Sequence, residues 1–209
     1  MTPVAPGVGM GRGRAALPVT LGLIAGGRGT RLGGVDKAWL LRDGQPQVAR
    51  LAGAFDGIAE VLVSSNSHDP RYAALGFHTV RDAAVGWGPI AGLSELAARC
   101  RTPWLMTLPV DVLDPSPELP GWLLAAARQD PGVPGIVVQD DGGLQPLVAL
   151  WRREVLAEHA RRALDAGRLA VRDLVAVAGL ATLPLPGRRL GNLNTLGDLH
   201  AAHVVLPQG

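Results

Sequence analysis

The chain has 209 residues, of which 47% are hydrophobic and 18% charged, a balance that supports a buried core and excludes disordered and collagen-like classes. Its formal net charge is only +2, so the pI of 9.3 is a weak indication of nucleic-acid binding. The single cysteine, Cys100, excludes an intrachain disulfide and cysteine-based zinc or iron–sulfur sites. Since no apolar segment has the length of a transmembrane helix, we expect a soluble globular protein without a nucleic-acid or membrane partner.

Residues 1–18 are rich in glycine and proline and include Arg12 and Arg14. They lack the apolar core that a secretory signal peptide needs. We therefore expect a flexible N-terminal leader over residues 1–18, a single domain over residues 19–209, and a cytoplasmic location.

Three short apolar runs lie in the first half of the chain, and each is followed by glycine or polar residues. They span Val19–Ile24, Glu60–Val63 and Trp104–Leu108. Segments with a helical spacing of apolar residues lie between them, from Val48 to Phe55 and from Ile90 to Ala97. This alternation predicts an α/β fold with three layers and a mostly parallel central sheet. The carboxyl ends of such strands meet at one edge, where ligands bind.

The second half continues with a predicted hairpin and shorter elements, without an evident linker or internal repeat. Asp141-Gly142-Gly143 separates two apolar stretches and predicts the hairpin turn, and Gly167 is placed to end the following helix. The predicted elements are strands over Gly135–Asp140, Gln145–Trp151 and Ala181–Leu185, helices over Glu154–Ala166 and Val171–Val177, and a final helix after Asn192–Thr195.

The stretch from Leu23 to Leu40, LIAGGRGTRLGGVDKAWL, is the most informative part of the sequence. Paired glycines directly after a strand let backbone N–H groups turn toward a phosphate. Arg28, Arg31 and Lys37 add positive charge, and Lys37 is the only lysine among the 20 Lys and Arg residues. The glycine spacing is one residue longer than a dinucleotide fingerprint, and the P-loop sequence is absent. The pattern predicts a polyphosphate site, although the glycines alone are equally typical of an ordinary strand-to-helix turn.

The order of residues in this stretch, L-I-A-G-G-x-G-x-R-L-G-x-x-D-K, resembles the signature of the MobA-like nucleotidyltransferases, the molybdenum cofactor guanylyltransferases. The resemblance covers the chain from Leu21 to Leu199 and implies a three-layer, Rossmann-like nucleotidyltransferase fold. Further matching segments are Gly88–Gly92, Leu108–Asp111, Gln145–Leu147 with Ala149 and Trp151, and Asn192–Thr195.

The resemblance implies an enzyme that uses Mg²⁺ to transfer GMP from GTP to the terminal phosphate of molybdopterin, with release of pyrophosphate. GTP and the molybdopterin-type cofactor are then its substrates, and the resemblance leaves room for contact with the machinery that inserts the finished cofactor. Positioning and charge neutralisation suffice for such a transfer, so neither a general base nor a covalent intermediate is expected. The residues do not identify the base. A cytidylyltransferase, a sugar-phosphate nucleotidyltransferase and a non-catalytic nucleotide-binding module are the alternatives.

Residue by residue, the resemblance implies a catalytic group of Lys37, Arg31 and Asp111, in which the two cations neutralise the triphosphate and Asp111 binds Mg²⁺. The intact Asp111 argues against a non-catalytic module. The implied nucleotide-binding positions are Ile24, Ala25, Gly26, Gly27, Gly29, Lys37, Ser64, Asn66, Asp82 and Asp111, with Gly27–Gly33 around the triphosphate.

Asn192 and Asn194 match a family segment near the second substrate, and capping of the last helix by Asn194 or Thr195 is an equally favoured alternative. Ser64 stands where relatives often carry Asn, so Asn66 is an alternative contact to the base or the ribose. The other departures from the family pattern are Val110 and Leu113 around Asp111, which we interpret as packing changes, and Leu196 after Thr195.

Other polar residues have simpler structural interpretations. Asp114 lies close to two prolines and is interpreted as a turn residue, with assistance to the metal as the weaker alternative. Asp140 and Asp141 are interpreted as a solvated hairpin turn rather than a metal pair. His200 and His203 lack further ligands and are expected at the surface. Cys100 is expected to be partly buried and inert. The pairs Arg161–Arg162 and Arg188–Arg189 are expected to be solvated, with contact between one pair and the pterin phosphate as the weaker alternative.

Overall fold

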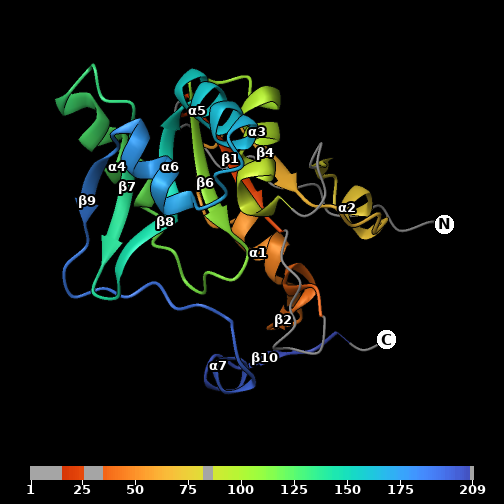
Figure 1. Cartoon of the computed structure of the whole chain (residues 1–209). Coiled ribbons are helices and arrows are strands. Elements are labelled where there is room, and N and C mark those ends of the chain that lie inside the picture. Colours follow the sequence, from red (N-terminus) through yellow and green to blue (C-terminus); the bar gives the residue numbers. More distant parts are fainter. Residues whose placement is uncertain (1–15, 26–34, 82–86, 208–209) are drawn as a thin grey trace.

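The computed structural model describes residues 16–25, 35–81 and 87–207. Within them the chain forms a seven-stranded central sheet in the order β5-β4-β1-β6-β8-β7-β9 (Figure 1). Strand β8 runs antiparallel to its neighbours β6 and β7, and the other pairs are parallel, so the predicted mostly parallel sheet is confirmed. The strands are β1 (Val19–Ile24), β4 (Glu60–Ser64), β5 (His78–Val80), β6 (Trp104–Pro109), β7 (Gly135–Asp140), β8 (Gly143–Arg152) and β9 (Ala181–Pro184).

The central strands form from apolar runs whose side chains are buried on both faces of the sheet. All six residues of β1 are buried, with Leu21 and Leu23 in the core on one face and Ile24 in the core on the other. Such runs are typical of parallel strands that are covered on both sides. The predicted ends of two strands differ from the structure by one residue, because β4 includes Ser64 and β6 includes Pro109.

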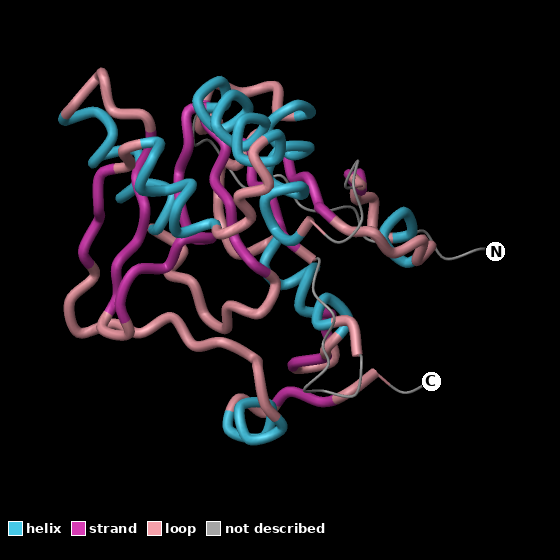
Figure 2. The backbone as a smooth tube through the Cα atoms, viewed as in Figure 1, coloured by secondary structure: helices cyan, strands magenta, loops and turns pink. Residues whose placement is uncertain are grey.

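Helices cover both faces of this sheet and complete the predicted three layers (Figure 2). On one face, Leu93 of α3 and Leu156 of α5 pack in the same core as Trp151. On the other face, Leu51 of α1 and Leu123 of α4 belong to a second core. The helices are α1 (Gln47–Ala52), α3 (Gly88–Arg99), α4 (Leu119–Gln129), α5 (Arg153–Asp165) and α6 (Val171–Ala178).

A small three-stranded sheet, in the order β10-β2-β3, joins the segment that follows Lys37 to the end of the described chain. Its strands and α7 lie below the central sheet in the view of Figure 1. Leu40, Leu193, Leu199 and Val204 form a separate apolar cluster there. The short elements are η2 (Lys37–Trp39), β2 (Leu41–Arg42), β3 (Gln45–Pro46), α2 (Arg71–Ala74), α7 (Leu196–Ala201) and β10 (Val204–Val205).

The predicted hairpin is confirmed between β7 and β8, but the predicted solvation of Asp140 is wrong. Asp141 is exposed in the turn, whereas Asp140 is only 5% exposed. The carboxylate of Asp140 accepts hydrogen bonds from Gly142 N (2.8 Å), Gln145 Nε2 (3.0 Å) and Leu190 N (2.8 Å). Burial raises the pKa of Asp140, but these bonds outweigh burial and hold the pKa below its ordinary value. Asp140 therefore fastens the hairpin to the segment that leads to α7.

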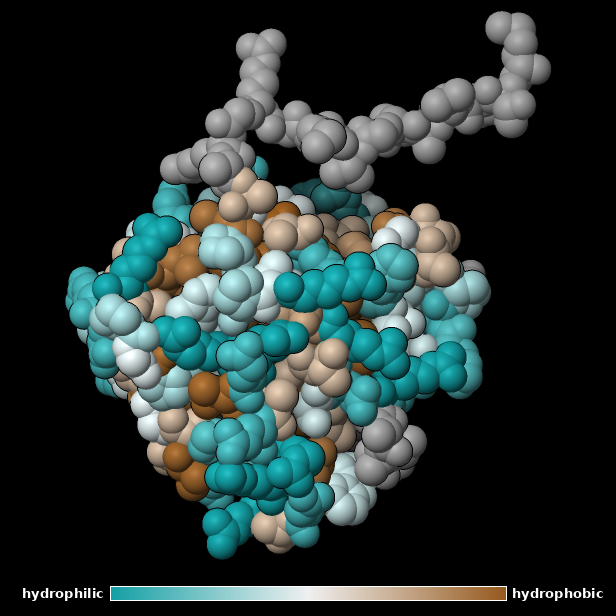
Figure 3. Space-filling view, turned by 90° about the horizontal axis from the view of Figure 1, so that it is seen from above, coloured by the Kyte–Doolittle hydropathy of each residue, from teal (hydrophilic) through white to brown (hydrophobic). Residues whose placement is uncertain are grey.

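Hydrophilic side chains are spread over the face of the molecule seen in Figure 3, with smaller apolar patches between them. Two of the most exposed large hydrophobic side chains are Val177 and Leu196, at 68% and 65% exposure. Among the helices of the described residues, none combines the length and the apolar character that crossing a bilayer requires.

Candidate active site

The carboxyl ends of β1, β4 and β6 meet at one edge of the central sheet, as the sequence predicts. Ile24 pairs with Ser64 on one side and with Pro109 on the other. Just beyond the strand, Ala25 N donates to Ser64 O (2.8 Å), and Val110 N donates to Ile24 O (3.1 Å). Three of the predicted nucleotide-binding positions, Ile24, Ala25 and Ser64, therefore lie side by side and are buried.

Lys37 occupies the first position of η2, and its ammonium group contacts two residues from distant parts of the chain. The Nζ atom donates to Asp111 Oδ2 at 3.0 Å and to Asn194 Oδ1 at 2.7 Å. Asp36 caps the turn by accepting a hydrogen bond from Ala38 N (3.0 Å). The side chains of Lys37 and Asp111 keep 20% and 25% exposure, so both remain accessible to a ligand. The structure thus brings together three residues that the sequence assigns to separate motifs.

The segment after β6 and the segment before α7 hold Asp111 and Asn194 in place through their backbones. Leu193 N donates to Asp111 O (2.9 Å), and Leu113 N donates to Gly191 O (2.9 Å). Between these two bonds, Val112 and Asn192 form an antiparallel bridge. The path of the second segment along the strand ends is visible in Figure 2. Asn192, the other predicted contact to the second substrate, lies in this bridge beside the residue that follows Asp111.

Asp198 is a residue of this region that the sequence analysis missed. Its Oδ2 accepts hydrogen bonds from Asn194 N (2.9 Å) and Thr195 N (2.7 Å), and its own N–H donates to Thr195 Oγ1 (3.1 Å). These bonds hold the pKa of Asp198 below its ordinary value. The T-x-x-D spacing of a capping box could have revealed it. Thr195 is the cap, so capping and the contact from Asn194 to Lys37 are made by neighbouring residues.

The carboxylate of Asp111 fits the predicted role of Mg²⁺ ligand. Its contact with Lys37 uses Oδ2, and the side chain is partly exposed at the strand edge. Mg²⁺ prefers oxygen ligands and keeps several waters, so one carboxylate beside substrate phosphates is a sufficient protein contribution. The described ranges contain no group of three or more His, Cys, Asp or Glu side chains placed to hold a metal.

Several predicted nucleotide contacts lie outside the described residues, and one lies in an exposed loop. Asn66 is exposed in the loop that follows β4. Those outside the described ranges are Gly26, Gly27, Gly29, Arg31 and Asp82.

The structure also places the residues that the sequence analysis assigned to other roles. Asp114 Oδ1 accepts from Arg42 Nη1 (2.7 Å) and from Arg50 Nη2 (3.4 Å), so it anchors two arginines in addition to following a turn. His200 and His203 are exposed, as predicted. Cys100 is buried. Arg161 and Arg162 are exposed and form ion pairs with Asp165 and Glu158, respectively. Arg188 lies over the ring of Trp122, and Arg188 and Arg189 both line a cavity of 170 Å³.

Comparison with other protein sequences finds relatives over most of the chain. The family model of the MobA-like NTP transferase domain matches residues 22–181. A molybdenum cofactor guanylyltransferase from Pseudomonas paraeruginosa is 34% identical over 190 residues, which is 89% of this chain and 94% of the relative. A protein of the same name from Pseudomonas aeruginosa is 34% identical over 182 residues, 85% of this chain and 91% of the relative.

Solved structures show the same fold. The molybdopterin-guanine dinucleotide biosynthesis protein A from Archaeoglobus fulgidus superimposes with a TM-score of 0.66 at 18% identity, over 88% of this chain and 96% of that one. A CMP:2-keto-3-deoxy-manno-octonic acid synthetase complexed with CTP gives a TM-score of 0.67 at 17% identity, over 90% and 96% of the two chains. With its matched domain, its relatives and its Rossmann-like nucleotidyltransferase architecture, the chain belongs to the MobA-like NTP transferase family.

Proposed function

We propose that this protein is a molybdenum cofactor guanylyltransferase, which transfers GMP from GTP to the terminal phosphate of molybdopterin. The observation that carries the proposal is the double contact of Lys37 with Asp111 and Asn194, which lie 74 and 157 positions away in the sequence. The ammonium group joins the phosphate-loop signature to a carboxylate and to the segment that matches the second-substrate region. The curated relatives that match most of the chain carry the same function in their names.

In the proposed reaction an oxygen of the molybdopterin phosphate attacks the α-phosphorus of GTP. The bond from the α-phosphorus to the oxygen that bridges to the β-phosphate breaks, and pyrophosphate leaves with that electron pair. Such a transfer depends on in-line positioning and on neutralisation of the developing charge. Lys37 supplies a positive charge at the site, and its fixed position costs no reorganisation during the reaction.

Asp111 is the residue that would hold Mg²⁺ in this proposal. The bound ion supplies further charge neutralisation on the phosphate oxygens. The contact of Lys37 with one oxygen of the carboxylate keeps Asp111 oriented toward the same region. Ile24, Ala25 and Ser64 form the adjoining strand edge, which we assign to the nucleoside. Asn192 and Asn194 approach from the other segment, which we assign to the second substrate.

Pyrophosphate release tests the proposal directly. The full-length protein should release pyrophosphate from GTP when Mg²⁺ and the molybdenum-loaded molybdopterin cofactor are both present, and chelation of Mg²⁺ should stop the release. A thermal-shift panel of GTP, CTP, ATP and UTP with Mg²⁺ should show the largest stabilisation with GTP. Release with CTP and none with GTP would instead identify a cytidylyltransferase.

Replacement of Asp111 by Asn separates a catalyst from a nucleotide-binding module. The substitution keeps the size of the side chain and removes its charge, so a Mg²⁺-dependent transferase should lose most of its turnover. Asp114→Asn is the matched control, because Asp114 binds arginines at the surface rather than Lys37. A wild-type protein that binds GTP and Mg²⁺ without any pyrophosphate release in the presence of the cofactor would support the binding module.

A further inference from the structure

The turn that carries Lys37 is packed against α2, an element that follows the neighbouring strand β4. Trp39, the last residue of η2, is only 3% exposed. The guanidinium carbon of Arg71 lies 4.1 Å from the centroid of its ring, and the ring of Tyr72 lies 4.7 Å away, centroid to centroid. Two consecutive residues of α2 therefore contact the residue that lies two positions after Lys37.

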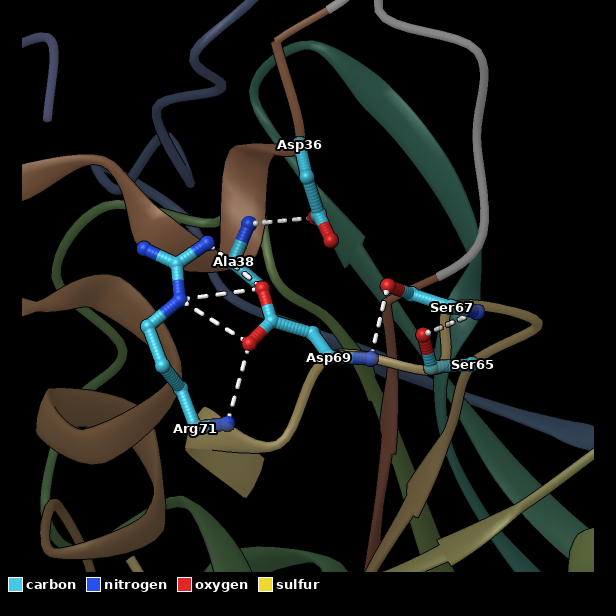
Figure 4. Close-up of polar contacts among 6 residues, drawn as sticks. All are labelled: Asp36, Ala38, Ser65, Ser67, Asp69 and Arg71. Carbon is cyan, nitrogen blue, oxygen red and sulfur yellow. Dashed lines mark hydrogen bonds and ion pairs between the residues drawn. The ribbon is translucent and has the colours of Figure 1, made fainter. Parts of the chain in front are cut away.

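Arg71 is itself held in one orientation by Asp69. Arg71 Nε donates to Asp69 Oδ1 (3.0 Å) and Oδ2 (2.9 Å), and the backbone N of Arg71 donates to Asp69 Oδ1 (2.9 Å), as Figure 4 shows. The hydrogen bonds from Arg71 hold the pKa of Asp69 below its ordinary value. A planar guanidinium fixed in this way presents its face to the indole ring with little further loss of freedom.

The hydrogen bonds continue from Asp69 back to the end of β4. Asp69 N donates to Ser67 Oγ (3.2 Å), and Ser67 N donates to Ser65 Oγ (3.2 Å), which Figure 4 also shows. Ser65 N in turn donates to Val80 O of β5 (3.0 Å). The loop between β4 and α2 is therefore braced by its own side chains. It begins directly after Ser64, which we assign to the nucleoside.

We propose that Arg71 is a positioning residue for Lys37, which it fixes through its contact with Trp39. This inference rests on the proposed function, since Lys37 acts on the nucleotide phosphates there. In a helix of three residues, a displaced Trp39 displaces Lys37 as well. Lys37 Nζ then moves away from Asp111 and Asn194. Through this contact, the end of β4, which we assign to the nucleoside, and the ammonium group of Lys37, which we assign to the phosphates, form one rigid unit.

Nuclear magnetic resonance tests the positioning without any substrate. Because Lys37 is the only lysine of the chain, a sample labelled with ¹³C- and ¹⁵N-lysine gives the side-chain signal of this one residue. Arg71→Ala should shift that signal, since the ammonium loses its fixed contacts. Arg71→Met keeps a long side chain beside Asp69 but lacks the flat guanidinium and adds no second lysine, and it should shift the signal in the same direction. An unchanged Lys37 signal in both variants would overturn the proposal.

The matched control is Arg152→Ala. The guanidinium carbon of Arg152 lies 4.8 Å from the ring centroid of Trp104, which begins β6 at the opposite end of the strand from Asp111. Arg152→Ala removes the same kind of contact and should leave the Lys37 signal in place, even where it lowers the melting temperature. A shift of equal size in the control would show that loss of stability, rather than positioning, moves Lys37.

Kinetics then test the consequence for transfer. Arg71→Ala should lower kcat by roughly 10- to 100-fold, the range expected for a misplaced charge, with a smaller change in the KM for GTP. In a double-mutant cycle with Trp39→Leu, the second substitution should add little to the loss of the first, because Arg71 acts through Trp39. Fully additive losses would contradict the proposed route. A wild-type protein without transferase activity would overturn the proposed function, while the Lys37 signal would still decide the positioning.

Discussion

At the scale of single residues, Lys37 shows why one lysine stands among arginines. Its ammonium group donates to a carboxylate at 3.0 Å and to an amide oxygen at 2.7 Å, and these acceptors come from different segments. A compact group that donates in several directions suits two such acceptors, whereas a planar guanidinium requires a wider and flatter arrangement. The proximity of Lys37 and Asp111 agrees with the expectation that the carboxyl ends of the strands meet at one edge of the sheet, although the sequence does not predict the strand order itself. The contact with Asn194 could not be predicted, because it depends on the path of a segment without regular structure.

Lys37→Arg should therefore keep the positive charge and still lose most of the turnover. The guanidinium cannot occupy the position of the ammonium without displacing Asp111 or Asn194. The measurement is kcat for pyrophosphate release from GTP, with the melting temperature as a check on folding. Arg161→Lys makes the reverse exchange in an exposed ion pair with Asp165 and should keep full activity. Near-normal turnover of Lys37→Arg would show that charge alone suffices.

Asp140 shows the limit of sequence reasoning at the same scale. An Asp beside two glycines is typical of a solvated turn, and nothing in the local sequence indicates burial. The residue is buried because Leu190, 50 positions away, donates its backbone N–H to the carboxylate. Long-range partners of this kind are not encoded in local patterns.

Asp140→Asn should lower the free energy of unfolding by about 1–3 kcal/mol. The carboxylate accepts bonds on both oxygens, so in either orientation the amide group of Asn turns an N–H toward another donor. Because the folded-state pKa lies below 3.8, the wild-type contribution is complete above that pH and is lost as the pH falls through the folded value. Urea denaturation over a pH series measures both effects. Asp141→Asn, at the exposed neighbouring position, should change stability much less, and equal losses would be contrary to this account.

At the scale of elements, the sequence predicts most of the long apolar segments, with α4 (Leu119–Gln129) as a missed one, and it predicts the short polar elements poorly. Strands β1, β4 and β6 and helices α5 and α6 agree with their predicted positions to within one or two residues. The strands β2, β3 and β10 each have two residues, too few for a periodic pattern. The site depends on both classes, since the long strands place Asp111 and the short elements place Lys37.

Helix α7 depends on its capping box, because it has only six residues and little buried surface. Thr195→Ala should lower the free energy of unfolding by about 0.5–2 kcal/mol, and it should accelerate hydrogen exchange of the α7 amides. Thr195→Ser keeps the hydroxyl acceptor for Asp198 N and should behave much like the wild type. If the Ala and Ser variants lose the same stability, the cap is not the cause.

At the scale of the whole molecule, the central sheet includes a close contact between β7 and β8, two strands from the second half of the chain. Gly135 opens β7 directly against β8, and a Cβ atom at this position would lie 2.5 Å from Leu150 O. Because a backbone oxygen cannot move away without disturbing the ladder, only glycine fits there. The packing of β7 against β8 in the seven-stranded sheet therefore leaves no room for a methyl group at position 135.

Gly135→Ala should destabilise the protein by about 1–3 kcal/mol, the usual cost of overpacking. Gly121→Ala is the matched control, because nothing lies within 4 Å of its Cβ position in α4. That substitution should stabilise the protein by about 0.5–1 kcal/mol, since alanine is the better helix former. In thermal denaturation, Gly135→Ala should lower the melting temperature and Gly121→Ala should raise it. Changes of the same sign would contradict this account of the packing.

The contact between Lys37 and Asn194 also sets the order in which the protein becomes competent during its synthesis. The two residues lie 157 positions apart, and Asn194 belongs to a segment beyond the matched domain at residues 22–181. A nascent chain can fold its first strands while the ribosome is still adding residues. The ammonium group of Lys37 can meet Asn194 only after the ribosome has added the segment that follows the matched domain. Incomplete chains that already display the phosphate-loop sequence are thereby kept from holding Lys37 in its working position.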